Sequence, residues 1–321
     1  MQRSTEPWVI VLAAGSGTRL GSLTVGSDGV VVPKQFCSLR GGRSLLLDTI
    51  DRALHLAPKE RIVVVVAADH ERWWRPQLAC LPAANIVVQP ANRGTTAGIL
   101  LPLAHVLGRD PSARVAVLPS DHFVAEPAVL NGAMQTALVC AAASRHLVLL
   151  GIAPDAADTE YGWIEPGTRT GALQTVASFV EKPLRARAEA LLAAGAVWNS
   201  FLFAADGATL WRLAARHAPA TTAAIAAAVL GPADDRAAAL ATAYADMASI
   251  DFSAVVLGRS PEDLRLLHVP PCGWTDLGTP PRVVECLQRL CPHDRLPHRA
   301  MWFPTVDLAR VARRQRTAVG A

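Results

Sequence analysis

The chain has 321 residues, of which 51% are hydrophobic and 18% are charged. This length allows one large or two ordinary domains, and the apolar content excludes an intrinsically disordered chain. No apolar run approaches the roughly 18 residues that span a membrane. A net charge of +4 does not require nucleic acid, so neither a membrane nor a nucleic acid is expected as a partner.

Short β-branched runs alternate with amphipathic stretches through the first half of the chain. Strands are expected at 8–13, 61–67, 85–89, 114–118 and 146–152, and helices at 44–56, 95–107 and 127–143. Strands that are apolar throughout indicate a sheet covered on both faces, and their alternation with helices predicts a doubly wound, mostly parallel α/β sheet. Ligands of such sheets bind beyond the carboxyl ends of the strands.

The second half has a different pattern. Residues 161–166, 173–180 and 197–204 are expected to be strands of an appended sheet, and 264–269 to be a further strand. The alanine-rich stretch 219–247 is typical of two surface helices. We expect an appended subregion here, without a flexible linker or an internal repeat.

The cysteines are dispersed and form no Cys-x-x-Cys pair, and the N-terminal stretch is a poor signal peptide. They are therefore expected to be free thiols in a reducing compartment, which predicts a cytoplasmic location. The six are Cys37, Cys80, Cys140, Cys272, Cys286 and Cys291.

The first expected strand ends in a glycine loop, Leu12-Ala-Ala-Gly-Ser-Gly-Thr-Arg-Leu20. Gly15 and Gly17 let the backbone approach a ligand and present its N–H groups, while Arg19 and Lys34 add positive charge. These features are typical of a triphosphate cradle. The Gly-Lys-Ser/Thr of the Walker pattern is absent, and leucine replaces the third glycine of the dinucleotide fingerprint. A purely structural turn remains the alternative.

The glycine loop is followed by a series of further motifs in a fixed order. They are Pro33-Lys-Gln-Phe36, Gln89-Pro-Ala-Asn-Arg-Gly-Thr95, Leu118-Pro-Ser-Asp-His122, Tyr161-Gly-Trp-Ile-Glu165, Phe179-Val-Glu-Lys-Pro183, Trp198-Asn-Ser200 and Gly273-Trp-Thr-Asp-Leu-Gly278. With them, the chain resembles the sugar-1-phosphate nucleotidylyltransferases over roughly residues 8–280, and most of all the mannose-1-phosphate guanylyltransferases (GDP-mannose pyrophosphorylases).

The resemblance implies a Rossmann-like, GT-A-like fold with a sugar-binding subregion. It implies a catalytic domain at 1–280, with the nucleotide in the N-terminal half and the sugar mainly at 155–280. A short C-terminal helix and a basic tail are expected at 281–321. A homodimer is also expected.

The resemblance also assigns roles to residues. The implied catalytic residues are Arg19, Lys34, Asp121 and Lys182. Those implied to bind the nucleotide are Ala13, Ala14, Gly15, Gly17, Thr18, Gln89, Arg93, Gly94 and Thr95. Those implied to bind the sugar are Gly162, Glu165, Glu181 and Asn199. Asp121 and Asp276 are implied to share a magnesium ion, which prefers one or two carboxylates together with substrate phosphates.

The implied reaction is attack of a hexose 1-phosphate on the α-phosphorus of a nucleoside triphosphate. GTP and mannose 1-phosphate would give GDP-mannose and pyrophosphate. The chain departs from the family pattern in a longer loop between Arg19 and Lys34, and in Phe201-Leu202, which replaces Gly-Met. Because of these departures, the identity of the base and that of the sugar stay open.

The alternatives are a cytidylyl- or uridylyl-transferase and a non-catalytic, nucleotide-sugar-binding regulatory protein. Paired glycosidase carboxylates are a further reading, against which the phosphate-binding loop argues. A triad of Ser120, Asp121 and His122 is geometrically poor, because neighbours on an extended segment point to opposite faces. His122 is expected to make structural hydrogen bonds instead.

Overall fold

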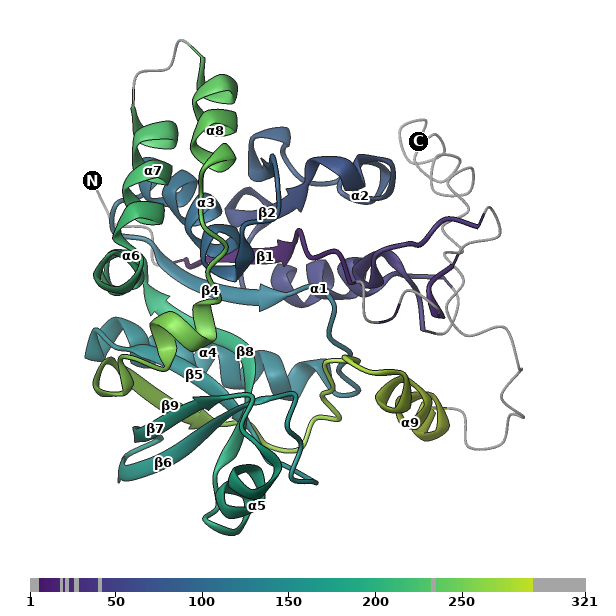
Figure 1. Ribbon diagram of the computed structural model, residues 1–321, viewed down its shortest axis with the longest axis vertical. Coiled ribbons are helices and arrows are strands. Elements are labelled where there is room, and N and C mark those ends of the chain that lie inside the picture. The colour runs from purple at the N-terminus through teal and green to yellow at the C-terminus, as the bar shows by residue number, and fades with distance from the viewer. Residues whose placement is uncertain are drawn as a thin grey trace.

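The computed structural model describes residues 6–17, 20, 23–25, 29–39, 42–231 and 235–290, and within them one nine-stranded sheet with helices on both faces (Figure 1). The strands are β1 (Trp8–Ala13), β2 (Ile62–Ala67), β3 (Ile86–Gln89), β4 (Arg114–Pro119), β5 (Leu147–Ile152), β6 (Gly162–Thr170), β7 (Leu173–Glu181), β8 (Val197–Asp206) and β9 (Leu264–His268). Their order in the sheet is β3-β2-β1-β4-β8-β5-β9-β7-β6.

The first four strands form the doubly wound part that the sequence predicts. β1 pairs in parallel with β2 and β4, and β2 pairs in parallel with β3. The observed bounds of these strands differ from the expected ones by one residue at most. β1 and β2 are apolar and almost wholly buried, because helices cover both of their faces.

The strands of the second half do not form the separate sheet that was expected, because they continue the first one. β8 lies antiparallel between β4 and β5 and so joins the two halves. β6 and β7 form a long hairpin at the far edge, and β6 also pairs with β8. β8 can occupy a central position because all but two of its ten residues are buried.

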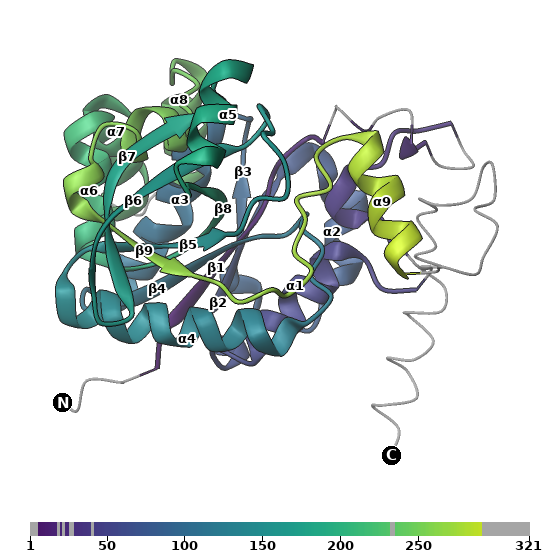
Figure 2. The ribbon, with the colours of Figure 1, turned by 90° about the horizontal axis from the view of Figure 1, so that it is seen from below.

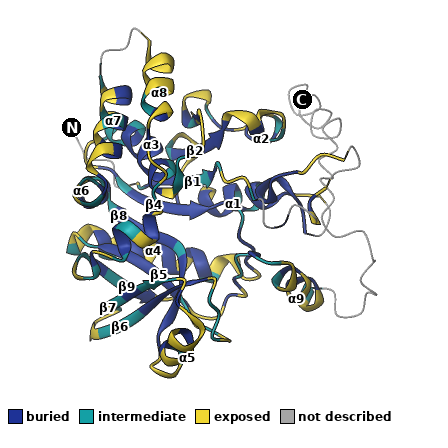
Figure 3. Cartoon of the chain, in the orientation of Figure 1, coloured by how far each residue is buried: buried dark blue, intermediate teal, exposed yellow. Residues whose placement is uncertain are grey.

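The helices are α1 (Leu45–Leu54), α2 (Glu71–Gln77), α3 (Gly94–Arg109), α4 (Pro127–Ser144), α5 (Arg185–Ala193), α6 (Gly207–His217), α7 (Pro219–Leu230), α8 (Arg236–Ala245) and α9 (Pro280–Leu290). They form a layer on each face of the sheet, except that α8 packs on α7 and α9 lies beyond the sheet (Figure 2). Alternation along β1 sends Val9, Val11 and Ala13 into the core with α1, α2 and α4. Trp8 and Ile10 enter the opposite core with α3, α6 and α7. The strands are buried between these layers, and the outer faces of the helices are exposed (Figure 3).

Two further expectations concern the chain as a whole. Within the described residues, no helix combines the length and the apolar character that crossing a membrane requires. None of the five cysteines in the described ranges is in a disulfide bond, in agreement with the expected thiols. α9 corresponds to the predicted C-terminal helix, while the basic tail lies outside the described residues.

Candidate active site

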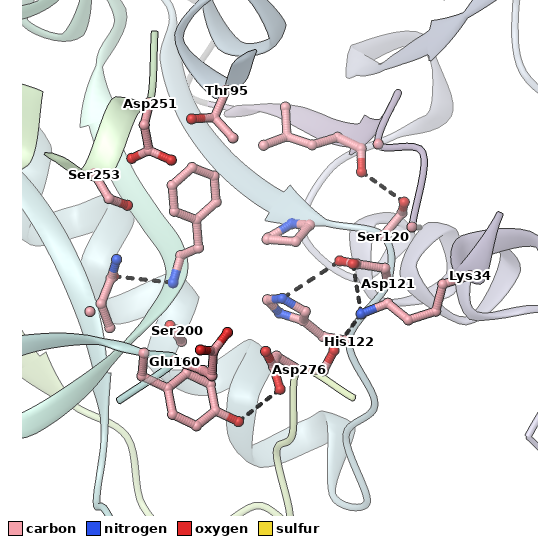
Figure 4. A pocket seen from close by; sticks show the side chains of 18 of the residues that line it. Lys34, Thr95, Ser120, Asp121, His122, Glu160, Ser200, Asp251, Ser253 and Asp276 are labelled. Carbon is pink, nitrogen blue, oxygen red and sulfur yellow. Dashed lines mark hydrogen bonds and ion pairs between the residues drawn. The ribbon is translucent and has the colours of Figure 1, made fainter. Parts of the chain in front are cut away.

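A cavity of about 310 Å³ lies at the carboxyl ends of β1 and β4 and extends to β6, β7 and β8. Both halves of the chain contribute to its walls. Of the residues singled out in the sequence, it is lined by Gly15, Gly17, Lys34, Thr95, Asp121, Gly162, Glu181, Lys182, Asn199 and Asp276. Figure 4 shows Lys34, Asp121 and Asp276 together on one side of the cavity, and Thr95, Asp251 and Ser253 on the other.

A second cavity, of about 260 Å³, adjoins the first and shares Gly15, Thr95 and Asp251 with it. The second cavity is also lined by Ala14, Gln89 and Gly94, which were expected to bind the nucleotide. The Nε2 amide of Gln89 donates to the main-chain oxygen of Ala91 (2.7 Å), but its buried Oε1 has no partner among the described residues. A residue that lines the second cavity thus keeps a buried acceptor without a partner, and such an atom needs an explanation.

Three of the expected site residues line neither cavity. Ala13 lies in the core, and Arg93 donates from Nε and Nη2 to the main-chain oxygens of Tyr244 and Ala245, at the end of α8. The Glu165 carboxylate accepts from the Ser178 hydroxyl (2.7 Å) and lies 3.5 Å from Arg187. The side chains of Arg93 and Glu165 thus hold elements together. Two further expected residues, Thr18 and Arg19, lie outside the described residues.

The glycine loop packs against the turn that carries Lys34. The Nε2 amide of Gln35 donates to the main-chain oxygens of Ala13 (3.0 Å) and Gly15 (2.7 Å). Gly17 has a positive φ of 61°, and a Cβ there would lie 3.0 Å from the main-chain nitrogen of Lys34. Glycine is therefore required at position 17 for this close approach.

Lys34 links the two aspartates of the cavity. Its side chain is buried, and its Nζ lies 2.8 Å from Asp121 Oδ2 and donates to the main-chain oxygen of Asp276 (2.5 Å). Burial has the largest single effect on the Asp121 carboxyl and would raise its pKa. The charge and hydrogen bond of Lys34, together with His122 and a main-chain hydrogen bond, outweigh burial and hold this pKa below its usual value. Asp121 is therefore ionised at neutral pH.

The second aspartate is held by three donors. Asp276 Oδ1 accepts from the Tyr161 hydroxyl (2.8 Å), the Gly278 amide (2.9 Å) and Arg282 Nη1 (2.9 Å). No cluster of three or more His, Cys, Asp or Glu side chains suited to a metal occurs in the described ranges. Asp121 and Asp276 both line the cavity, and two carboxylates nevertheless fit magnesium, which takes its remaining ligands from substrate phosphates and water.

His122 has a structural role in this arrangement. Its Nδ1 accepts from the Trp274 indole N–H (3.2 Å), and burial lowers its pKa to about 4, so the imidazole is neutral. The Ser120 hydroxyl donates to the main-chain oxygen of Leu12 (2.7 Å) and not to His122. The catalytic triad is thus not formed.

The far end of the cavity is built around Glu181 at the end of β7. Burial, together with the negative charge of Asp251, raises the pKa of Glu181 to about 7, against the opposing effect of Lys182. A Cβ on Gly162 would lie 2.5 Å from Glu181 Oε2, so position 162 admits only glycine while Glu181 keeps this orientation. Asn199 Oδ1 accepts from the Phe201 amide (3.1 Å), which leaves its amide donors available to a ligand.

Phe201 departs from the family pattern at a position with an unusual backbone. Its φ is 58°, in the left-handed region where glycine is favoured, which accounts for the glycine usual there. The ring contacts Phe203 and Phe252 edge to face, at centroid distances of 6.2 Å. These contacts stabilise the larger side chain, which lines the cavity.

Sequence reasoning missed the segment that brings Asp251 and Ser253 to the cavity. It docks on the Arg93–Thr95 turn: the Ile250 amide donates to the Arg93 oxygen (3.3 Å), and the Phe252 amide to Thr95 Oγ1 (2.7 Å). No glycine or motif marks the segment, so no local signal could have identified it. Gln35 and Tyr161 also line the cavity; they stand in recognised motifs but were given no role, and Glu160, a further cavity residue, was not singled out.

We expect Gly94→Ala to destabilise the protein by about 1–3 kcal/mol, because φ is 78° and the new Cβ would lie 2.5 Å from the main-chain oxygen of Ile250. The new Cβ would meet main-chain atoms of Ile250, which no side-chain rotation can move away, so the 249–253 segment would have to shift. Gly132→Ala in α4 is the control. Its Cβ meets open space in a helix, so a gain of up to about 1 kcal/mol is expected. Urea unfolding curves measure both, and equal stabilities would contradict the prediction.

Comparisons with known proteins give the following. The sequence profile of the nucleotidyl transferase family matches residues 8–291. A mannose-1-phosphate guanylyltransferase of Sinorhizobium fredii is 32% identical over 283 residues, which are 84% of this chain and 52% of that protein. The xanthan biosynthesis protein XanB of Xanthomonas campestris is 38% identical over 199 residues, which are 60% of this chain and 41% of that protein. The chain thus spans about half or less of the length of these relatives.

Solved structures share the fold. The crystal structure of a mannose-1-phosphate geranyltransferase from Thermus thermophilus matches with a TM-score of 0.73 and 31% identity, over 85% of this chain and 77% of that one. A UDP-glucose pyrophosphorylase matches with a TM-score of 0.60 at 13% identity, over 90% of this chain and 100% of that one. They confirm the predicted fold class, a mixed central sheet flanked by helices.

Proposed function

The chain belongs to the nucleotidyl transferase family, and on this premise we propose that it transfers GMP from GTP to mannose 1-phosphate, forming GDP-mannose and releasing pyrophosphate. The match of the family profile confirms the family that the sequence motifs indicated. Relatives named mannose-1-phosphate guanylyltransferase support mannose as the sugar and guanine as the base. One observation carries the proposal: a single cavity joins the glycine loop, Lys34 and Asp121 to Glu181, Lys182 and Asn199.

The proposed reaction is an in-line displacement. A phosphate oxygen of the hexose 1-phosphate forms a bond to the α-phosphorus, the bond from this phosphorus to the bridging oxygen breaks, and pyrophosphate leaves with that electron pair. A phosphate monoester has a second pKa near 6, so the nucleophile is already ionised and needs no general base. The protein then acts by positioning and by neutralising charge, through Lys34 near the triphosphate and Lys182 near the sugar phosphate.

Magnesium would be held by Asp121 and Asp276 in this proposal. When bound, it would supply positive charge that offsets the charge of the phosphates. Lys34 contacts Asp121 and the main chain of Asp276, so it orients the two groups that would hold the ion. Arg19 is proposed to contact the triphosphate, on the resemblance of the glycine loop alone.

Gln89 lines the second cavity, and its buried Oε1 has no partner among the described residues, which favours a base that carries ring N–H donors. Guanine has adjacent N–H donors on its Watson–Crick edge, whereas adenine and cytosine present an unprotonated ring nitrogen there. Uracil also has one N–H donor, so a uridylyltransferase is the second candidate. The names of the relatives favour guanine.

Pyrophosphate release with each of GTP, UTP, CTP and ATP, against mannose 1-phosphate and glucose 1-phosphate, tests the proposal. GTP with mannose 1-phosphate should be the fastest pair. A site that hydrogen-bonds specific hydroxyls rejects an epimer strongly, since an inverted hydroxyl leaves its partner unpaired. Equal rates with both sugars would overturn the sugar assignment, a faster UTP or CTP reaction the base, and no turnover with any pair the enzymatic proposal.

Use of the hexose 1-phosphate should depend on pH through Glu181. The ionised carboxylate can accept hydrogen bonds from sugar hydroxyls at both oxygens, and with its pKa raised to about 7 it becomes protonated as the pH falls through 7. We expect kcat/KM for the sugar phosphate to fall about tenfold between pH 8 and pH 6. In Glu181→Gln, the pH dependence that comes from the substrate's own phosphate should remain, whereas the part of the pH dependence that comes from Glu181 should be lost. Identical pH profiles in the two proteins would contradict the prediction.

A further inference from the structure

Arg282, in the first turn of α9, is a largely buried cation that contacts the wall of the active-site cavity. Its side chain is 11% exposed, and its Nη1 lies 2.9 Å from Asp276 Oδ1 and 3.1 Å from Oδ2. Its Nη2 pairs with Asp158, and its guanidinium lies over the Tyr161 ring, 4.0 Å from the centroid. One side chain thus contacts three groups around the cavity and ties α9 to them.

The contacts of Arg282 fix the orientation of the Asp276 carboxylate. Oδ1 accepts from Tyr161, Gly278 and Arg282, whereas among the described residues Oδ2 has only the longer contact with Arg282. A Cβ on Gly278 would clash with Asp276 Oδ2 and lie 2.9 Å from Arg282 Nη1. The glycine therefore leaves the space in which aspartate and arginine meet. Oδ2 keeps unused acceptor capacity, because an ionised carboxylate oxygen takes more than one donor.

Tyr161 is held by the same cation. Its ring contacts both the Arg282 guanidinium and the Trp198 indole, whose centroid is 4.5 Å away, and its main-chain oxygen accepts from the Lys182 amide (3.2 Å). Asn199 follows Trp198 directly and lines the cavity. A displacement of Arg282 would therefore reach the metal side and the sugar side of the cavity together.

We propose that Arg282 is a positioning residue that holds the Asp276 carboxylate and the Tyr161 ring in the geometry needed for divalent-cation binding. The inference rests on the proposed function, in which Asp276 is a metal ligand. Arg282 itself does not touch the substrate in this arrangement. Groups that orient a metal-ligating carboxylate commonly affect affinity for the metal by 10–100-fold when they are removed.

The test measures binding of Mn²⁺ in the presence of GTP, by electron paramagnetic resonance of the free ion. Arg282→Met should weaken Mn²⁺ binding by about tenfold. Arg282→Lys should restore part of it, because an ammonium keeps the charge but lacks the fork that reaches Asp276 and Asp158 together. Asp158→Asn should also weaken Mn²⁺ binding, since it removes a partner of Arg282 without touching the metal site.

Arg289→Met is the matched control on the same helix. Arg289 pairs with Asp155 at 3.7 Å, and both side chains are mostly exposed, so its Mn²⁺ binding and thermal unfolding should equal those of the parent. Unchanged Mn²⁺ binding in Arg282→Met would overturn the inference. Tighter binding would do so too, because Arg282 would then be a competitor for the carboxylate.

Two further measurements complete the test. If Arg282→Met fails to fold, Arg282→Lys and Asp158→Asn decide the matter: binding like the parent's in both overturns the inference, and a loss in both supports it. Turnover of the parent enzyme with GTP and mannose 1-phosphate is measured separately. An active parent with an indifferent Arg282→Met refutes the positioning role alone, whereas an inactive parent refutes the proposed function.

Discussion

Asp121→Asn is expected to reduce turnover by about 10²–10³-fold while the protein stays folded, which is the usual loss when one preorganised electrostatic group is removed from an active site. The carboxylate lies 2.8 Å from Lys34 Nζ and is proposed to bind magnesium. Asparagine has the same shape and can still accept from Lys34, but it carries no charge. Steady-state pyrophosphate release at limiting magnesium measures the loss, and urea unfolding checks the fold.

Asp155→Asn provides the control for this change, because that carboxylate is mostly exposed and pairs only loosely with Arg289. A near-parental rate in Asp121→Asn would refute its metal role. The double variant with Lys34→Met separates two explanations. If Asp121 serves only to hold Lys34, the double variant should be no slower than Lys34→Met alone. An additional loss would indicate a second task for the carboxylate.

The local pattern of the first half was enough to predict its strands and three of its helices, because those segments are apolar and end at turn residues. The bounds expected for β1 were confirmed at both ends. α2 was missed because it has only seven residues and contains Pro76, which a helix-period pattern penalises. α6 was not predicted either, although the sequence contains a signal for its start. The Asp206 carboxylate accepts from the Thr209 amide, and aspartate is a favoured N-cap residue.

The position of β8 was beyond local reasoning. Its pairing with β4 and β5 joins segments about 50–90 residues apart, and such pairing is decided by burial on both faces and not by the strand's own pattern. The same limit applies to the site. Motifs locate Arg93 and Glu165, but not the direction in which each side chain points, and Asp251 is brought in by tertiary docking. The homodimer, the cytoplasmic location and the division of the chain at residue 280 remain predictions.

Gly162→Ala should impair use of the hexose 1-phosphate by about a hundredfold, because a misplacement of about 1 Å in an active site has effects of that size. The new Cβ would lie 2.5 Å from Glu181 Oε2, 3.1 Å from Phe179 Cζ and 3.4 Å from Asn199 Cβ. The closest atom is the free end of a flexible side chain, so Glu181 can rotate away. The change should therefore cost little stability and leave GTP binding intact.

A double-mutant cycle makes this explanation testable. If Gly162→Ala acts only by displacing the Glu181 carboxylate, then Gly162→Ala combined with Glu181→Gln should be no worse than Glu181→Gln alone. The sugar phosphate's kcat/KM is compared across the four proteins, with the Kd for GTP and urea unfolding as the checks. Fully additive losses would mean that the methyl group fills space needed by the sugar itself. A large loss of stability in Gly162→Ala would instead show that Phe179 and Asn199, and not Glu181, absorb the new methyl group.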